Sequence, residues 1–345
     1  MIFRTVLLSL SLVLAFLSLA CTSRPNQPST EITSSSSSSA PVAAAEEVPL
    51  HAPRFAVIPE SARPGDPITV AYSDTFAWQP EKAQNLTVQL LSSSGKVLSK
   101  ANFFSPGWHD RNHGEIKTAL FSVPSTAVRG SASIRIQSDH GIIRDLPFII
   151  EGRDFQSETI PLNQANTDLR TAPNPERVAE SQRLWAILAH TGTEIFSDGA
   201  FLPPVTSTRL TSFFGSRRVF QYSGGGSDTS IHAGIDYGVP TGTPVTAPAR
   251  ARVILARPRI VTGNSIILEH LPGVYSLYYH LDTLSVAEGA IVERGQTIAH
   301  SGNTGLSTGA HLHWELRVST ENSDPHAFLA RSILDKNDIL DTLKE

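Results

Sequence analysis

The sequence predicts a mainly β protein made of two β-rich domains joined by one linking helix. Short runs of alternating apolar and polar residues fill most of the chain, Gly, Pro, Asn and Asp separate them, and only one long stretch has helical apolar spacing. A chain of 345 residues has room for about two domains with hydrophobic cores. The formal net charge of −4 gives no reason to expect a nucleic-acid partner.

Residues 1–20 have the pattern of a secretory signal peptide. Arg4 precedes an apolar run from Val6 to Leu17, which is short for a membrane span. Cys21, the only cysteine, follows this run directly, and the arrangement resembles the bacterial lipoprotein signal, in which the cysteine carries the lipid. Ordinary cleavage that leaves a spare thiol is the alternative. Because a lone cysteine has no disulfide partner, we predict lipidation of Cys21.

Residues 21–49 are predicted to be a flexible tether. The segment is rich in Ser, Pro, Ala and Thr, and residues 34–39 are six consecutive serines. Such a segment has too little apolar surface to offset the entropy lost on ordering. We therefore expect an exported lipoprotein with a long leash. Its lipid would lie in an outer membrane, facing the periplasm, or on the outer face of a cytoplasmic membrane.

Residues 50–153 are predicted to form a β-sandwich of Ig-like character. Turn sequences such as Arg63-Pro64-Gly65-Asp66 separate the strand-like runs. The segment carries no cluster of chemically active residues, so we interpret it as a spacer or binding module. The predicted strands are 68–72, 86–91, 116–121, 133–136 and 145–150.

Residues 154–200 are predicted to be a linker that contains a helix at about 175–190. Asn174 provides an N-cap and Pro175 the first helical residue, while Gly192 suits a C-terminal cap. We expect the helix to pack between the two domains, with Trp185 in the core. The apolar positions of the helix are Val178, Leu184, Trp185, Ile187 and Leu188.

Residues 201–332 are predicted to form a second all-β domain, followed by a C-terminal tail, 333–345, that includes a short helix. Gly, Pro, Val and Thr are frequent in this segment, and long helical patterns are absent from it. The predicted strands are 245–249, 251–255, 264–270, 275–280 and 311–318.

Two pairs of residues in the second domain suggest a metal site. His311 and His313 lie two residues apart, so both would project from one face of a strand. Taken alone, such a pair is better explained as two histidines on a half-exposed strand whose hydrogen-bonding groups are satisfied and which bind no metal. His232 and Asp236 are also spaced for one strand face, and Gly234 between them allows a close backbone approach. Three nitrogen or oxygen ligands match a catalytic zinc, whereas structural zinc usually needs several cysteines.

The second domain resembles the LytM/lysostaphin-type zinc metallopeptidases, peptidoglycan endopeptidases that carry one HxxxD and one HxH motif. The resemblance extends from about residue 201 to residue 329 and implies the duplicated hybrid β fold of that family. Small departures are Ala299, where Gly is frequent, and Ala310, where Pro is frequent. The matching segments are 211–217, 242–248, 263–264, 279–281 and 302–313, together with HxxxD at 232–236.

The resemblance implies a role for each residue of the motifs. His232, Asp236 and His313 would bind one Zn²⁺ per chain, and His280 and His311 would be the active-site histidines that do not bind metal. One of these two would accept a proton from water and the other would stabilise the transition state. We favour His311 as the base, with the exchanged assignment left open.

The resemblance further implies that Arg217 and Asn264 contact the substrate, although Arg217 could equally be an ordinary surface residue. His270 and His300 match no ligand position and are interpreted as structural or exposed.

The function implied by the resemblance is hydrolysis of stem or cross-bridge peptides in peptidoglycan. A second hypothesis is an inactive LytM-like protein that binds the cell wall or regulates another hydrolase. Inactive members usually lack ligand positions, and all five motif residues are present here. A third hypothesis keeps the protease and replaces the substrate by Gly-rich protein.

Overall fold

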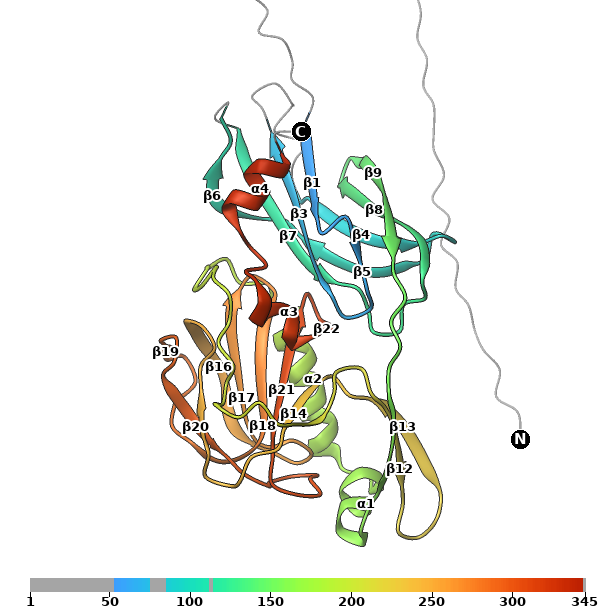
Figure 1. Cartoon of the computed structure of the whole chain (residues 1–345), viewed down its shortest axis with the longest axis vertical. Helices are drawn as coiled ribbons and strands as arrows, with labels where there is room; N and C mark the ends of the chain where they lie inside the picture. Colours follow the sequence, from blue (N-terminus) through green and yellow to red (C-terminus); the bar gives the residue numbers. More distant parts are fainter. Residues whose placement is uncertain (1–52, 75–84, 112–113, 344–345) are drawn as a thin grey trace, which may run out of the picture. The chain divides into compact units, whose positions relative to one another are not determined.

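The computed structural model describes residues 53–74, 85–111 and 114–343, and these residues form one compact unit within Pro49–Glu345 (Figure 1). The predicted signal peptide, Cys21 and the tether lie outside the described residues. Strands dominate and helices are few, so the prediction of a mainly β fold is confirmed. None of the helices in the described part has the length and apolar character needed to cross a membrane.

The N-terminal part is a sandwich of two β-sheets. One sheet has the order β1-β3-β7-β6 and the other the order β2-β9-β8-β4-β5. The strands are β1 (Arg54–Ile58), β2 (Ser61–Ala62), β3 (Pro67–Asp74), β4 (Thr87–Ser92), β5 (Val97–Asn102), β6 (Phe104–His109), β7 (Glu115–Ser122), β8 (Gly130–Ser138) and β9 (Gly141–Ile150).

The core of the sandwich follows from the alternation along its strands. Ile68 and Val70 of β3 meet Val88 and Leu90 of β4 between the sheets, and all four side chains are buried. Residues of opposite parity on the same strands face outward, as period-2 side-chain geometry requires. The Ig-like character of this sandwich remains a prediction.

The linker contains one strand and two helices: β10 (Ser157–Pro161), α1 (Gln164–Thr171) and α2 (Pro175–Ala189). Asn174 caps α2, as predicted, because its side chain accepts a hydrogen bond from the Arg177 amide. The predicted cap at Gly192 is wrong. The helix ends at Ala189 with an extended His190, whose amide donates to the Ala186 and Ile187 carbonyls, so no left-handed residue is required.

Helix α2 packs on the sheet of the second domain, which corrects the predicted position between the domains. Leu184, Ile187 and Leu188 contact the buried residues of that sheet. Trp185 is 52% exposed, so its predicted place in the core is also wrong. The side chains at 184, 187 and 188 share the face toward the sheet, and Trp185 lies beside that face under the Arg317 guanidinium.

The second domain is built on a large β-sheet of order β11-β14-β21-β18-β17-β16-β19, and β15, β20 and β22 pair with strands of this sheet or with one another. A separate three-stranded sheet has the order β10-β12-β13. The strands are β11 (Leu210–Ser212), β12 (Arg217–Gln221), β13 (Ser227–Ile231), β14 (Gly234–Tyr237), β15 (Pro244–Thr246), β16 (Ala251–Arg259), β17 (Gly263–Leu271), β18 (Val274–Leu284), β19 (Ile291–Val292), β20 (Thr297–Ser301), β21 (Leu312–Val318) and β22 (Glu321–Ser323).

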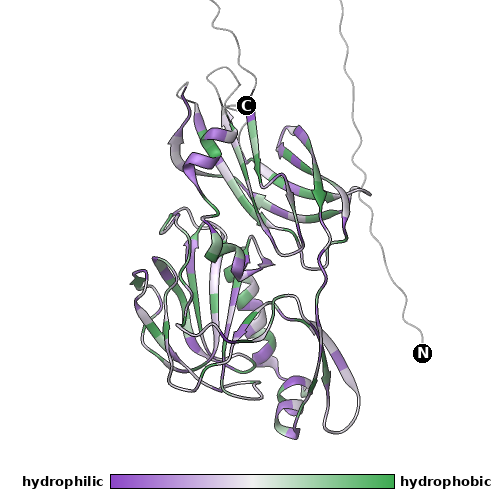
Figure 2. Cartoon of the chain, viewed as in Figure 1, coloured by the Kyte–Doolittle hydropathy of each residue, from purple (hydrophilic) through white to green (hydrophobic). Residues whose placement is uncertain are grey.

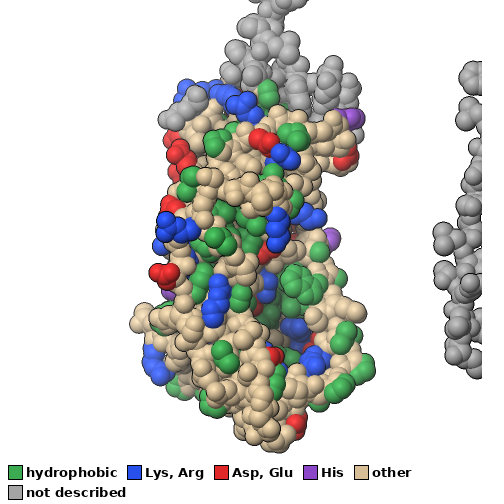
Figure 3. All heavy atoms as spheres, turned by 90° about the vertical axis from the view of Figure 1, so that its right-hand side faces the viewer, with side chains coloured by type: hydrophobic (Ala, Val, Ile, Leu, Met, Phe, Trp, Pro, Cys, Tyr) green, Lys and Arg blue, Asp and Glu red, His purple; other side chains and the backbone are tan. Residues whose placement is uncertain are grey.

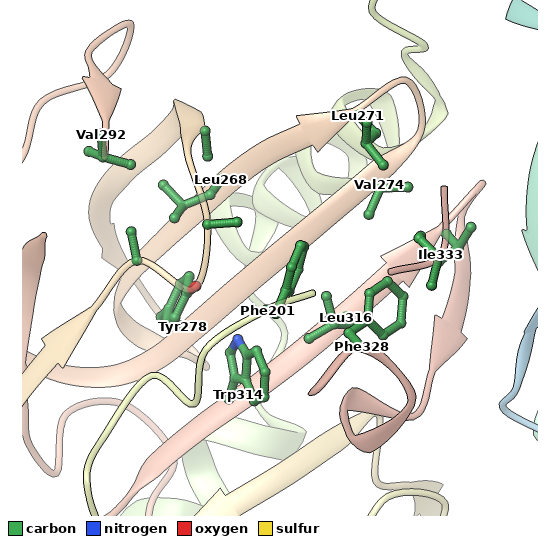
Figure 4. Close-up of a cluster of buried hydrophobic side chains, with 14 of the residues drawn as sticks. Phe201, Leu268, Leu271, Val274, Tyr278, Val292, Trp314, Leu316, Phe328 and Ile333 are labelled. Carbon is green, nitrogen blue, oxygen red and sulfur yellow. The ribbon is translucent and has the colours of Figure 1, made fainter. Parts of the chain in front are cut away.

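One hydrophobic core supports the large sheet. Trp314 and Leu316 of β21 face the same interior as Tyr278 of β18, Leu268 of β17 and Phe201 (Figure 4). Hydrophobic and hydrophilic residues are interspersed along the strands of both domains (Figure 2). Leu312 and Trp314, the residues that flank His313 on β21, are fully buried.

The segment after β22 returns to the sandwich. It contains α3 (Pro325–Ala330) and α4 (Lys336–Thr342). Ile333 and Ile339 pack in one core with Ala71 and Leu120, which lie on the outward face of the first sandwich sheet. The segment predicted as a tail is therefore a packed part of the fold.

The surface carries mixed charges. In the view of Figure 3, positive, negative and hydrophobic side chains of the described residues are interspersed, without a large patch of one sign.

Candidate metal centre

Two neighbouring strands bring the predicted carboxylate and one predicted histidine ligand together. Asp236 on β14 is paired directly with His313 on β21. Tyr279 of β18 is the next residue across the sheet, and its ring stacks on the His313 ring at 5.2 Å with an interplanar angle of 4°. Directly opposed residues on adjacent strands project from the same face, so the pairing itself sets the distance between the two ligands.

His232 reaches the site from a short connection rather than from a strand. It lies between β13 and β14, so the prediction that His232 and Asp236 share one strand is wrong. Its backbone is held by reciprocal bonds: the His232 amide donates to the Ser216 carbonyl, and its carbonyl accepts from Gly215. The imidazole is nevertheless directed at Asp236, with Nε2 3.1 Å from Oδ1.

The three candidate ligands converge on one point and are buried. His232 Nε2 lies 2.9 Å from His313 Nδ1, and His313 Nδ1 lies 2.9 Å from Asp236 Oδ1. The residues are only 2%, 6% and 7% exposed for His232, Asp236 and His313. They are also the one group among the described residues whose His, Cys, Asp and Glu atoms are arranged to hold a metal ion.

In both imidazoles the outer nitrogen, the one that points away from the three candidate ligands, has a hydrogen-bond acceptor beside it. His232 Nδ1 lies 2.9 Å from the Phe213 carbonyl, and His313 Nε2 lies 3.4 Å from a Glu315 carboxylate oxygen. Because a carbonyl and a carboxylate only accept, each outer nitrogen carries a proton. Burial alone would lower the pKa of His313, but the hydrogen bonds and charges of Asp236 and Glu315 raise it. Burial also lowers the pKa of His232, which favours the neutral form.

This donor set fits a divalent metal. Two unprotonated ring nitrogens and a carboxylate oxygen, about 3 Å apart, repel one another unless they share a cation, and all three can lie within the 2.0–2.2 Å bonds of zinc. An imidazole whose second nitrogen donates to a carboxylate or carbonyl is the usual arrangement of a zinc ligand. The set has no cysteine and only three members, as catalytic zinc sites do.

A buried ion pair between Glu315 and Arg317 lies beside His313 and holds its ring. Glu315 lies two residues further along β21 and forms an ion pair with Arg317, which lies two residues further again. Burial alone would raise the pKa of Glu315, but the Arg317 charge and the His313 hydrogen bond lower it to about 2. The carboxylate is therefore ionised and fixes the orientation of the His313 ring.

Asp236 has a cationic partner of its own. Its second oxygen, Oδ2, accepts a 2.6 Å hydrogen bond from Arg218 Nη2, while Oδ1 faces the two histidines. The two oxygens are thus assigned to different partners, and only Oδ1 remains for a metal. The Arg218 side chain is 16% exposed and the Asp236 side chain 8%, so this ion pair is largely shielded from water.

His280 and His311 lie next to the ligands, as predicted. Their rings are 4.8 Å apart, and His311 Nε2 is 3.8 Å from Asp236 Oδ1. Each Nδ1 is bound to a carbonyl, that of Thr304 at 2.7 Å and that of Gly309 at 2.8 Å, so each Nε2 is free to accept a proton. Burial lowers the pKa of His280 to about 3.

The two predicted substrate contacts are placed differently. Arg217 is not brought to the site: its Nη2 donates to the Ser125 carbonyl at 2.7 Å, and its guanidinium stacks on Phe155. Neighbouring residues of a strand face opposite sides, so Arg218 points to Asp236 and Arg217 points away. Asn264 lies near His280 on β17, where its amide donates to the Asp282 carbonyl.

The structure also locates His270 and His300, the two histidines that were predicted to be structural or exposed. His270 is fully buried, with Nε2 2.7 Å from the Ser276 hydroxyl, and burial lowers its pKa to about 3. His300 lies on β20 beside the Thr283 hydroxyl. Neither is part of the metal centre.

Sequence reasoning missed several residues around the site. Glu315 and Arg317 could have been found, because the period-2 alternation that links His311 to His313 continues to both of them. Ser212, Arg218 and Glu158, which lies 78 residues before Asp236, show no such signal. Glu158 meets Arg218 through the pairing of β10 with β12, and Ser212 is placed beside Asp236 by the pairing of β11 with β14.

Comparison with known proteins shows which family the region around this site resembles. Residues 230–325, which include His232, Asp236, His280, His311 and His313, match the profile of Peptidase family M23. A solved structure from Pseudomonas aeruginosa, described as a peptidase M23, has a TM-score of 0.50 and covers 77% of this chain and 93% of that chain. Its sequence identity is 20%, so this likeness concerns the fold alone.

Two relatives of known name align with the same region. DD-carboxypeptidase/endopeptidase Mpg of Neisseria meningitidis is 37% identical over 136 residues, 39% of this chain and 30% of Mpg. Peptidoglycan DD-endopeptidase ShyA of Vibrio cholerae is 38% identical over 116 residues, 33% of this chain and 26% of ShyA. The chain thus matches less than a third of the length of these relatives. The segment from residue 230 to residue 325 is thus similar to the peptidases of family M23, in agreement with the resemblance to the LytM type.

Proposed function

We propose that the protein is a zinc-dependent endopeptidase that hydrolyses peptide cross-links of peptidoglycan. The observation that carries the proposal is the convergence of His232, Asp236 and His313, with His280 and His311 beside them, inside the M23 domain. The names of the relatives support a bond of the DD type as the first substrate to test.

The residues of the chain divide the chemical work in this proposal. His232, Asp236 and His313 would hold zinc, which when bound supplies a Lewis acid that polarises a peptide carbonyl and eases the deprotonation of water. His311 is assigned as the proton acceptor because its free Nε2 lies 3.8 Å from Asp236 Oδ1, beside the ligand atoms. His280 would contact the carbonyl or the leaving amine of the substrate from the other side of His311.

The location of the enzyme is also a proposal. The apolar run before Cys21 and the Ser-rich segment after it support an exported lipoprotein. A lipid anchor followed by a long tether would place the catalytic domain within reach of the cell wall, where its substrate lies.

The test is digestion of isolated peptidoglycan by the purified unit Pro49–Glu345, which contains every contact described above. We expect new peptide ends, identified by mass spectrometry of the products, and complete inhibition by a zinc chelator that added zinc reverses. A protein that binds peptidoglycan, contains no zinc and releases no products would support the inactive LytM-like alternative instead. Cleavage of Gly-rich protein with no effect on peptidoglycan would support the third hypothesis, a protease whose substrate is Gly-rich protein.

The backbone of His280 provides a further prediction. His280 has φ = 59°, the left-handed region, which costs a residue with a Cβ about 1–2 kcal/mol. His280→Gly and His280→Ala both remove the imidazole, so both should lose about 10²–10⁴-fold in activity. Their free energies of unfolding should differ: the Gly variant is expected to be more stable by about 1 kcal/mol. An Ala variant as stable as the Gly variant in denaturant titration would contradict the strain at this position.

A further inference from the structure

We propose that Glu158, on the linker strand that precedes the M23 domain, is a positioning residue of the metal centre that sets its affinity for zinc. It would act through Arg218 and Ser212, without contacting metal or substrate. The inference rests on the proposed function in one respect, since it requires that the site binds zinc.

The pairing of two strands places Glu158 behind the candidate ligands, on the side that faces away from the point on which they converge. Strand β10 pairs in parallel with β12, and the register places Glu158 directly beside Arg218. Residue 158 lies outside the region that matches the M23 profile, which begins at residue 230. A segment that connects the sandwich to the peptidase domain therefore supplies a side chain to the surroundings of the ligands.

The contacts form a short network behind two of the three ligands. The Ser212 hydroxyl donates to Glu158 Oε1 and lies 3.2 Å from His232 Nδ1. Arg218 Nη2 donates to the same hydroxyl at 2.7 Å and to Asp236 Oδ2 at 2.6 Å. Glu158 Oε2 lies 3.7 Å from Arg218 Nε, so the carboxylate spans both residues.

The charge of Glu158 explains why the network suits a metal site. The positively charged guanidinium of Arg218 lies against Asp236 Oδ2. If no negative charge balanced it, this guanidinium would repel a divalent metal ion bound at Oδ1 and weaken its binding. Glu158 balances that charge, so Arg218 can hold Oδ2 and direct Oδ1 inward at little electrostatic cost. Glu315 and Arg317 form the corresponding pair behind His313. Each of these two ligands thus has one acid and one arginine behind it.

The backbone pairing of β10 with β12 does not depend on the Glu158 side chain, so its role can be separated from the fold. Glu158→Gln keeps the shape of the side chain and removes its charge. The Glu158 side chain is 25% exposed, so the neutral amide can be accommodated. Asp154→Asn is the matched control, because it removes one negative charge from an exposed position on the same segment.

The experiment measures zinc affinity of the full chain by competition with a chromophoric chelator, together with thermal unfolding of the zinc-free protein. For Glu158→Gln we expect 10–100-fold weaker zinc binding, the usual cost of losing an outer partner, with zinc-free unfolding close to that of the parent. Activity lost at limiting zinc should return with excess zinc. Asp154→Asn should bind zinc like the parent.

Further variants test whether Glu158 acts through Arg218 and Ser212. Arg218→Gln should also weaken zinc binding, and the double variant Glu158→Gln/Arg218→Gln should lose less than the product of the two single losses, since both act on one ion pair. If Glu158→Gln does not fold, Ser212→Ala serves as the second variant and should weaken zinc binding several-fold.

The outcomes separate this inference from the proposed function. Parent protein that binds zinc and a Glu158→Gln variant that binds it equally well would overturn the positioning role and leave the proposed function standing. Lower zinc-free stability with unchanged zinc affinity would overturn it too, because the role would then be structural. Parent protein that binds no zinc would overturn both.

Discussion

His313→Ala is expected to bind no zinc at stoichiometric concentration and to leave peptidoglycan undigested. The substitution removes one of only three donor atoms, so the loss should exceed the 10–100-fold that loss of an outer partner costs. It also removes the ring that separates Asp236 from Glu315, two buried carboxylates. Zinc content by atomic emission and peptide release from peptidoglycan measure the two effects.

The matched control for this variant is His300→Ala. His300 lies on β20 in the same domain, where its ring contacts the Thr283 hydroxyl and no candidate ligand. This variant should retain one zinc per chain and the activity of the parent. Stoichiometric zinc and normal digestion in the His313→Ala protein would show that the metal centre has been assigned to the wrong residues.

Gly234→Ala is expected to destabilise the fold by about 3 kcal/mol, the upper end of the usual cost of overpacking, and to weaken zinc binding as well. A Cβ at this position would lie 2.1 Å from the Trp314 carbonyl oxygen and 2.9 Å from Glu315 Cα. Because both atoms belong to the backbone of β21, they cannot move aside as a side chain could. Strands β14 and β21 would have to separate, and these strands hold Asp236 opposite His313.

Chemical denaturation and chelator competition on the same preparation measure both consequences. Gly199→Ala is the control, since a Cβ there would meet nothing within 4 Å. It should change the free energy of unfolding by less than about 0.5 kcal/mol. If Gly234→Ala were as stable as this control, the close approach of the two strands could not be what sets the ligand geometry.

The candidate ligands could be proposed from the sequence because the motifs that carry them combine particular residue types at short spacings. The HxH spacing follows the period of a strand, and Gly234 was predicted to permit the backbone contact that the structure shows between β14 and β21. The buried side chains of β21 were predictable by the same alternation. Local periodicity thus accounts for the strand that carries His313 and for the residues behind it.

What could not be predicted depends on pairing between distant segments. The motif resemblance selects Arg217, yet the face that each residue of β12 presents is fixed by its pairing with β10 and β13. Arg218 therefore reaches Asp236 and Arg217 reaches Ser125 instead. Trp185 was misplaced for a related reason: the apolar stripe of α2 is wider than the face that the sheet covers.

The return of the C-terminal segment to the sandwich has a consequence for how the protein unfolds. The chain leaves the sandwich after Ile150, and later residues contact it at several points: Arg217 donates to the Ser125 carbonyl, Ser319 donates to the Leu120 carbonyl, and the Ile333 carbonyl accepts a hydrogen bond from Thr69. The second domain is thus attached to the sandwich near its start and along its C-terminal segment, and separation of the two parts requires all of these contacts to break. We therefore expect the sandwich and the peptidase part to lose structure as one cooperative unit, although their boundary is distinct in the sequence.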